Sequence, residues 1–408
     1  MNIIDIITKK RLKEELSYEE LSYAFNSYLK GLVKDYQMSS LLMAIVINGM
    51  SDTETFNLTD IFIKSGDRLD LSGIKGTKID KHSTGGIGDK ITLIIGPIVA
   101  SLGVVVPKMS GRGLGYTGGT IDKLESIKGF KTSLTETEFI RELKDIGFAI
   151  TSQTSNLCPM DKYIYALRDV TGTTESIPLI ATSIMSKKIA GGADKILIDI
   201  KCGEGALIKT KEDANKLKTL MERIGAHYQK ETICEITDMN TPLGTNIGNA
   251  LEVMEAMDVL NGKQGKLTDL SIELASQMVS IGLNINIEEA KNKVLENINN
   301  KKALNKFLEF VKYQGGDISS LKVSSYKEEV KSQKSGIVKS IKALNIGKLS
   351  CSLGAGRLNK EDKIDYSVGI VLNKVIGDKV NINDTLFTMY KKDDTKVLID
   401  IDDYYEII

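Results

Sequence analysis

The strongest constraint on the fold is a change of residue pattern near residue 70. Residues 1–65 have helical spacing, and Ser17 and Ser51 each stand three residues before a glutamate, which is the capping-box signal for the start of a helix. After the first box, one buried helical stripe is expected, formed by Leu21, Phe25, Tyr28 and Leu32. From 70 to about 330, short β-rich runs alternate with helix-length segments, as in an α/β layer built on a largely parallel sheet. The β-rich runs are 104–110, 148–152, 195–201 and 232–236, and the helices between them include 135–146 and 210–228.

Two further segments complete the predicted organisation. A second helical patch, 158–192, interrupts the alternation, and we expect it to return to the N-terminal helices. After about 330 the chain has short strands with Gly and Asn-Asp turns. The expected class is α/β (α+β multidomain): a small all-helical domain, a large α/β domain with a mostly parallel or mixed sheet, and a β-rich C-terminal α/β piece. Their expected boundaries are 1–65 with 160–192, then 70–158 with 193–330, then 335–408.

Composition excludes several classes of function. Lys plus Arg and Asp plus Glu both number 54, so the chain lacks the basic excess typical of nucleic-acid binding. The longest apolar run, 41–47, is far shorter than the roughly 20 residues of a membrane span, and Asp5 interrupts the N-terminal apolar run that a signal peptide would need. Four scattered cysteines and two histidines favour neither a zinc site nor a disulfide framework. We therefore expect a soluble cytoplasmic protein with no nucleic-acid or membrane partner.

The first loop suited to chemistry is "KHSTGGIGDKIT", residues 81–92. Its glycines let backbone N–H groups converge on an anion, and the apolar helix that follows adds the positive end of its dipole. Lys81, Ser83 and Thr92 supply side-chain donors suited to phosphate. The Walker A spacing cannot be aligned on this loop, so it predicts a different kind of phosphate site.

The second loop is "KMSGRGLGYTGGTIDKLESI", residues 108–127, which should leave the end of a strand and open a helix near Thr120. Gly113, Gly115 and Gly118 form a G-x-G-x-x-G pattern, but its surroundings are not typical of a dinucleotide site. Two donor-rich glycine loops at strand ends are better explained by one phosphate held between them.

A third cluster lies in "YALRDVT" and "SIMSKK", where Ser183 and Lys187 are four residues apart and should share one helix face. With Arg168 they offer donors that match a planar, carbonyl-rich ligand, although this cluster taken alone favours a solvated helix face with a structural salt bridge such as Arg168–Asp169. His82 stands beside the phosphate-type donors and can transfer a proton near neutral pH, whereas His227 is expected to be structural.

Taken together, these motifs resemble the thymidine phosphorylase and pyrimidine-nucleoside phosphorylase family, which shares a fold with anthranilate phosphoribosyltransferase. The resemblance rests on "DKHSTGGIGDK", "KMSGRGLGYTGGTIDKLESI", "YALRDVT" and "SIMSKKIAGG", and it runs over nearly the whole chain. It implies the reversible phosphorolysis of a pyrimidine nucleoside by inorganic phosphate, which gives the free base and (deoxy)ribose 1-phosphate. It also implies a homodimer formed through the helical domains.

The resemblance also implies roles for individual residues. Phosphate would be bound by Lys81, Ser83, Thr92, Lys108, Ser110 and Thr120. The pyrimidine would be held by Arg168, Ser183 and Lys187 with Tyr165 nearby, and His82 would face the O2 side of the base and stabilise or protonate it as it leaves. No organic cofactor or divalent metal is implied. Some bacterial members bind K⁺, and the matching positions here are Gly88, Lys90, Leu243, Asn246 and Glu255.

Three departures from the family pattern stand out. Tyr116 replaces the usual histidine of "GLGHTGG", and Glu204 replaces a small serine. Lys90 occupies a K⁺-ligand position that is often threonine, where its ammonium would disfavour the ion unless only its carbonyl is used.

The same residues also allow different functions. With Lys108 directly before "MSGRG", the chain resembles the broad members of the family, which accept uridine as well as thymidine. A strict thymidine phosphorylase is therefore the second candidate function. A Mg²⁺-dependent phosphoribosyltransferase of the same fold and a non-catalytic nucleoside-binding protein are the remaining candidates.

Overall fold

The computed structural model describes residues 1–113, 115–116, 118–153, 156–357 and 362–408. They form two compact units. Unit 1 comprises Met1–Gly73, Gln153–Ile200 and Thr210–Ile236, and unit 2 comprises Ile74–Ser152, Lys201–Lys209 and Thr237–Ile408. Within the described ranges, every helix is too short or too polar to cross a lipid bilayer.

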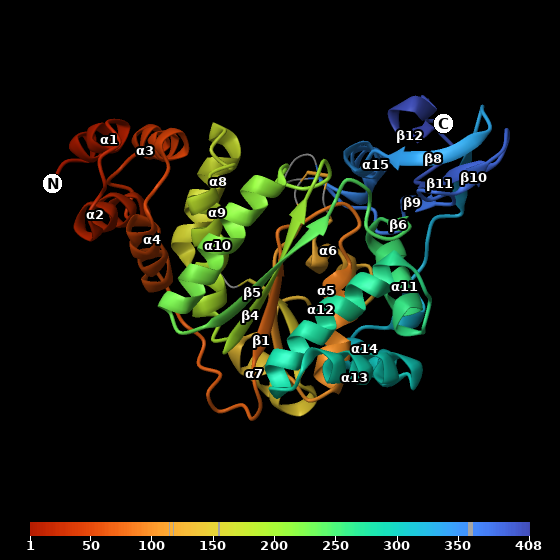
Figure 1. Ribbon diagram of the computed structural model, residues 1–408, viewed down its shortest axis with the longest axis horizontal. Coiled ribbons are helices and arrows are strands. Elements are labelled where there is room, and N and C mark those ends of the chain that lie inside the picture. Colours follow the sequence, from red (N-terminus) through yellow and green to blue (C-terminus); the bar gives the residue numbers. More distant parts are fainter. Residues whose placement is uncertain (114, 117, 154–155, 358–361) are drawn as a thin grey trace. The chain divides into compact units, whose positions relative to one another are not determined.

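Unit 1 begins with four helices, which lie in the segment that the sequence predicts to be helical (Figure 1). They are α1 (Ile3–Arg11), α2 (Tyr18–Leu29), α3 (Asp35–Asn48) and α4 (Asp52–Lys64). Both predicted capping boxes are present, because Ser17 accepts from the Glu20 N–H and Ser51 accepts from the Glu54 N–H, while each glutamate side chain bonds back to the cap. One part of the predicted stripe is wrong: α2 ends at Leu29, and Leu32 is 70% exposed.

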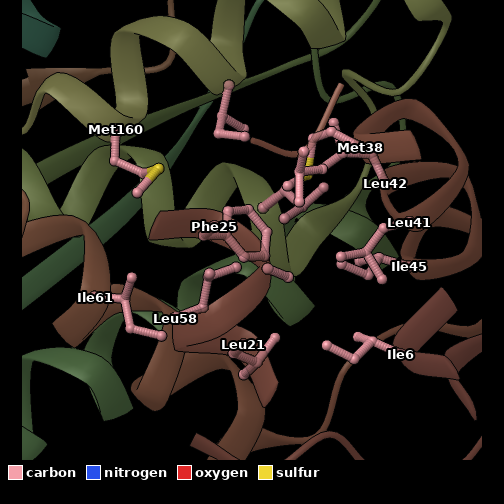
Figure 2. Close-up of a cluster of buried hydrophobic side chains, with 14 of the residues drawn as sticks. Ile6, Leu21, Phe25, Met38, Leu41, Leu42, Ile45, Leu58, Ile61 and Met160 are labelled. Atoms are coloured by element: carbon pink, nitrogen blue, oxygen red, sulfur yellow. The ribbon is translucent and has the colours of Figure 1, made fainter. Parts of the chain in front are cut away.

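The later helices of unit 1, α8 (Pro159–Thr171) and α9 (Ile177–Ala190), return to the N-terminal helices. Met160 of α8 lies in the same buried cluster as Phe25, Leu58 and Ile61 (Figure 2). The prediction that the 158–192 patch rejoins the N-terminal segment is therefore confirmed. Strands β4 (Lys195–Cys202) and β5 (Glu231–Asp238) are neighbours in one sheet and are connected by α10 (Lys211–His227).

Unit 2 contains the parallel strands of its α/β layer. β2 (Val106–Ser110) pairs with β3 (Phe148–Ser152) in parallel register, and β1 (Ile79–Ser83) lies beside β2 through a hydrogen bond of 2.9 Å from the Ile79 N–H to the Val105 carbonyl. Ser83 and Ser110 are the last residues of β1 and β2, so parallel pairing places them at the same sheet edge.

One of the connecting helices of unit 2 is almost entirely buried. In α5 (Ile91–Ser101) every residue from 91 to 100 is buried, and a Cβ on Gly96 would lie 2.5 Å from the Phe148 ring, so glycine is needed for this close packing. α12 (Lys266–Leu283) and α14 (Lys302–Tyr313) pack on α5. The other helices are α6 (Thr120–Glu125), α7 (Glu136–Ile146), α11 (Asn249–Leu260), α13 (Ile287–Asn299) and the short η1 (Ile318–Ser320).

The C-terminal part of unit 2 is β-rich, as predicted. One antiparallel sheet has the order β6-β9-β11-β7, and a second has the order β10-β8-β12. Their strands are β6 (Asn246–Ile247), β7 (Tyr326–Lys331), β8 (Gly336–Ile341), β9 (Gly369–Leu372), β10 (Lys379–Val380), β11 (Thr385–Lys391) and β12 (Tyr405–Ile407). Helix α15 (Ala343–Ser350), the π-turn η2 (Cys351–Ala355) and the 3₁₀ turn η3 (Ile401–Asp403) complete this part.

Candidate active site

The first glycine loop connects β1 to α5, as predicted from the sequence. Gly85 and Gly88 have φ angles of +91° and +75°, which side chains rarely adopt. A Cβ on Gly88 would also lie 2.7 Å from the Leu243 carbonyl oxygen. The loop therefore needs glycine at position 88 both for its backbone conformation and for its close approach to the 243 segment.

Three buried lysines surround one carboxylate in this loop. Lys81, Lys123 and Lys201 are each at most 1% exposed, and all three interact electrostatically with Asp89. Burial by itself would raise the pKa of Asp89, but the three ammonium groups and a hydrogen bond donated by Ser83 hold that pKa well below its usual range. The site thus stabilises negative charge at the N-terminal end of α5, where backbone N–H groups also favour an anion.

Lys123 connects the second glycine loop to the first. Its ammonium donates to the Asp89 carbonyl at 2.6 Å and to the Gly118 carbonyl at 3.1 Å, and it pairs with Glu252 at 2.9 Å. The N–H of Gly113 donates to the Asp122 carboxylate at 2.6 Å, which holds the start of this loop on α6. These contacts bring the two donor-rich loops of unit 2 into one neighbourhood.

The remaining predicted phosphate residues lie on the same elements. Thr92 is buried in the first turn of α5, Thr120 is the first residue of α6 as predicted, and both Ser110 and Thr120 are partly buried. Lys108 is buried in β2, and its ammonium donates to the Lys81 carbonyl at 2.6 Å. Leu114 and Thr117, within the "GLGYTGG" motif, lie outside the described residues.

Two departures from the family pattern have visible environments. The Tyr116 ring is 41% exposed, and the Lys348 ammonium lies over it at 5.6 Å from the ring centroid, a cation–π contact that an imidazole would make less well. Glu204 is exposed, so its extra carboxylate is solvated.

The sequence analysis missed the roles of Asp89, Lys123 and Lys201 in this cluster. Lys201 lies near the carboxyl end of β4, and ligands in α/β sheets bind outside the carboxyl ends of strands. That rule could have identified Lys201. Lys123 carried no comparable signal, because a lysine on a short helix usually faces solvent.

The third predicted cluster lies in unit 1, on α8 and α9. Lys187 donates to the Ser183 hydroxyl at 3.1 Å, which confirms that the two residues share a helix face. Lys187 also pairs with the buried carboxylate of Asp161 on α8. Tyr165 lies on the same helix as Asp161 and is 46% exposed.

Arg168 is almost fully buried at the end of α8. Its guanidinium donates to the backbone carbonyls of Thr173, Leu179 and Thr174 at 3.0, 3.3 and 2.8 Å. These three bonds use three of its five N–H donors and fix its plane. The guanidinium is thus rigidly held between the end of α8 and the start of α9.

The two histidines have different surroundings. His82 is partly buried in β1, where strand alternation directs its side chain away from the face that carries Lys81 and Ser83. His227 stacks on Phe56 with ring centroids 4.8 Å apart, an apolar contact consistent with a structural residue.

The residues that match the family's K⁺ positions do not fit a bound ion in this chain. The ammonium of Lys90 is fully buried and donates to the carbonyls of Leu243 and Asn246, both at 2.8 Å, and to Glu255 at 2.6 Å. A potassium ion would have to share these oxygens with a positive charge already bound to them. The contribution of Gly88 here is the close approach of its loop to Leu243.

Comparison with known proteins agrees with this geometry. Three family models match the chain: the glycosyl transferase family helical bundle domain over residues 4–66, the glycosyl transferase family a/b domain over 75–304, and the pyrimidine nucleoside phosphorylase C-terminal domain over 337–407. A curated pyrimidine-nucleoside phosphorylase of Staphylococcus haemolyticus is 50% identical over 398 residues, which covers 96% of this chain and 92% of the relative. One of Staphylococcus aureus is 51% identical with the same coverage.

The chain belongs to the pyrimidine-nucleoside phosphorylase family. Among solved structures, anthranilate phosphoribosyltransferase from Thermus thermophilus matches with a TM-score of 0.59 at 16% identity, over 76% of this chain and 99% of that one. At that identity the likeness is one of fold. It agrees with the fold expected for a pyrimidine-nucleoside phosphorylase from the sequence motifs.

Proposed function

We propose that the protein catalyses the reversible phosphorolysis of pyrimidine nucleosides: uridine, thymidine and deoxyuridine. The products are the free base and α-D-ribose 1-phosphate or its 2-deoxy form. The observation that carries this proposal is the group of three buried lysines, Lys81, Lys123 and Lys201, around Asp89 at the start of α5. It supplies positive charge for a phosphate in a chain that is half identical to curated pyrimidine-nucleoside phosphorylases.

The reaction requires two kinds of stabilisation. A phosphate oxygen forms a bond to C1′ while the C1′–N1 bond breaks. The electron pair of the C1′–N1 bond leaves with the base, which takes up a proton. Positive charge develops on the sugar and negative charge on the base. In this proposal phosphate is bound by Lys81, Ser83, Thr92, Lys108, Ser110 and Thr120, with Lys123 and Lys201 completing the positive field.

The departing pyrimidine is assigned to the α8–α9 cluster. Arg168, Ser183 and Lys187 would bind its carbonyl and N–H groups, with Tyr165 beside them. Two donors of the Arg168 guanidinium remain after its three carbonyl bonds, and its fixed plane suits a planar ring.

His82 would stabilise or protonate the departing base. Its side chain, on the opposite face of β1 from Lys81 and Ser83, is suited to the base rather than to the phosphate. General acid assistance of this kind contributes roughly 10²–10⁴-fold.

The proposal extends to assembly and location. Segments 1–65 and 160–192 would bind the pyrimidine and form a homodimer, and several large apolar side chains exposed on these helices support that role. The four cysteines are buried and none of them forms a disulfide, which supports a reducing, cytoplasmic environment.

The test is phosphate-dependent release of free base from uridine and from thymidine, measured side by side with His82→Ala. We expect both nucleosides to be cleaved, with a loss of about 10²-fold or more in kcat for the variant. Cleavage of thymidine alone would identify a strict thymidine enzyme. Transfer of a phosphoribosyl group from phosphoribosyl pyrophosphate to a free base that stops with a chelator, or binding of nucleoside without turnover, would contradict the proposal.

A further inference from the structure

The ammonium of Lys90 occupies an oxygen cage that is buried inside unit 2. Its three N–H donors match three acceptors: the carbonyl oxygens of Leu243 and Asn246 and one carboxylate oxygen of Glu255, at 2.6–2.8 Å. The Lys90 side chain is 0% exposed and that of Glu255 is 2% exposed. A lysine so deeply buried requires a complete set of partners, and this cage provides one.

Further hydrogen bonds hold the oxygen atoms of the cage in place around the Lys90 ammonium. Glu255 accepts hydrogen bonds from the Thr245 N–H and hydroxyl at 2.9 and 2.8 Å and from the Asn246 N–H at 3.0 Å. These bonds orient the carboxylate while the carbonyls on either side point at the ammonium. A Cβ on Gly244 would lie 2.5 Å from a Glu255 carboxylate oxygen and 2.9 Å from the Lys90 nitrogen, so this turn leaves no room for a side chain.

Two carbonyls and a carboxylate are also the kind of oxygen ligands that bind a monovalent metal cation. Glu255 neutralises one positive charge, and the Lys90 ammonium already supplies it. The cage adjoins the phosphate cluster in two ways. Asp89 directly precedes Lys90 in the sequence, and the N–H of Leu243 donates to the carbonyl of Ile87, in the glycine loop, at 2.9 Å. The cation thereby fastens the 243–246 turn and the first half of α11 to the glycine loop.

We propose that Lys90 is a covalently attached replacement for a monovalent metal ion, so that this chain neither binds nor needs K⁺ to order its glycine loop. Shortening the side chain to threonine removes the ammonium and opens a space lined by the three oxygens of the cage and a new hydroxyl. The variant should then bind K⁺ and depend on it.

The first experiment compares thermal and urea unfolding of the full chain in KCl and in choline chloride at equal ionic strength, for the unmodified protein, Lys90→Thr and Lys90→Met. The unmodified protein should unfold identically in both salts. Lys90→Thr should be less stable in choline and should gain stability as the K⁺ concentration rises past its dissociation constant. Above the K⁺ dissociation constant, each tenfold rise in K⁺ should raise its folding equilibrium constant about tenfold. Lys90→Met fills the space without charge and should be destabilised equally in both salts.

The matched control is Lys263→Met. Lys263 lies 3.5 Å from the other Glu255 oxygen but is 43% exposed, so its loss removes a neighbouring charge without opening the cage. This variant should show no K⁺ response. Stabilisation of the unmodified protein by K⁺ relative to choline would overturn the proposal, and so would a Lys90→Thr chain that is equally unstable, or fails to fold, in both salts.

The second experiment measures phosphorolysis in the same salts, and this part rests on the proposed function. The unmodified enzyme should have the same kcat/KM in K⁺ and in choline, while Lys90→Thr should recover activity only with K⁺. Absence of phosphorolysis in every salt would contradict the proposed function. The unfolding experiment would then be the test of the proposal for Lys90. Activity of the unmodified enzyme that rises saturably with K⁺ would count against the inference.

Discussion

The ammonium of Lys108 donates a 2.6 Å hydrogen bond to the backbone carbonyl of Lys81. Both residues are buried, and they lie near the ends of neighbouring strands β1 and β2. The bond fixes the backbone immediately before His82. Lys108 therefore controls the position of residues assigned to both the phosphate and the base.

This relationship predicts the effect of Lys108→Met. A hydrogen bond to a charged group is worth about 1.5–3 kcal/mol, so kcat/KM for phosphate should fall by about 10- to 150-fold. Uridine should lose more activity than thymidine, because the sequence resemblance connects this lysine with broad substrate acceptance. Steady-state kinetics with both nucleosides would measure the two effects. Lys128→Met, which removes an exposed lysine, is the control and should leave the kinetics unchanged. An unchanged uridine-to-thymidine ratio in Lys108→Met would contradict the role in breadth.

A second prediction concerns Lys187, which contacts Ser183 and the buried Asp161. Lys187→Met should reduce kcat/KM for the nucleoside by about 10- to 150-fold through loss of a charged donor, with little change in the KM for phosphate. The variant should also lose stability, because Asp161 is then buried without its cation.

The double variant Lys187→Met, Asp161→Asn separates these two effects. It should recover stability in urea unfolding, since no uncompensated charge remains, but it should not recover the affinity for nucleoside. Recovery of both would mean that Lys187 acts only by neutralising Asp161.

Much of the fold could be predicted from local signals. The capping boxes at Ser17 and Ser51 located two helix starts correctly, because a cap depends on residues three positions apart. The prediction for Leu32 was wrong because the helical spacing of apolar residues continues beyond the end of α2 at Leu29. Spacing predicts a face but does not predict where the chain leaves the helix.

The site was less predictable, for a different physical reason. The lysines around Asp89 come from residues 81, 123 and 201, and their convergence depends on tertiary packing that no local pattern contains. Lys90 is the clearest case. Its position in the ion-site pattern was evident, but whether its side chain or only its carbonyl would face the cage depended on the course of the 243–246 turn.

A third prediction concerns dimer formation through the helical segment. Tyr36 and Ile47 of α3 are 72% and 73% exposed, and in the proposed homodimer a partner subunit would cover them. Burying an isoleucine contributes roughly 1.5–3 kcal/mol, and a twofold interface contains it twice. Ile47→Asp should therefore raise the dimer dissociation constant by about two orders of magnitude or more.

Sedimentation velocity over a concentration series would measure this. Leu398→Asp changes a leucine that is 97% exposed in the C-terminal part, and it should leave the dimer intact. Equal effects of the two substitutions would argue against the helical interface.

The last prediction follows from Glu142, a carboxyl buried on α7. Burial raises the pKa of Glu142 from its ordinary value of 4.5 to about 8, so the folded protein holds this carboxyl protonated at neutral pH while the unfolded chain ionises it. Between these two values the folded state binds more protons than the unfolded state. The stability that Glu142 contributes is thus complete below pH 4.5 and is lost as the pH rises towards 8.

Glu142→Gln removes this titration and keeps the shape of the side chain. At 1.36 kcal/mol per pH unit, the unmodified protein should lose about 2–3 kcal/mol of unfolding free energy relative to the glutamine variant between pH 5 and pH 7. Urea unfolding at the two pH values would measure this difference. Glu136→Gln, on an exposed position of the same helix, is the matched control and should follow the unmodified protein at both pH values. If the unfolding free energy of Glu142→Gln changes between the two pH values as much as that of the unmodified protein, the Glu142 carboxyl is ionised in the folded state. A cation or a water molecule must then reach this buried carboxylate.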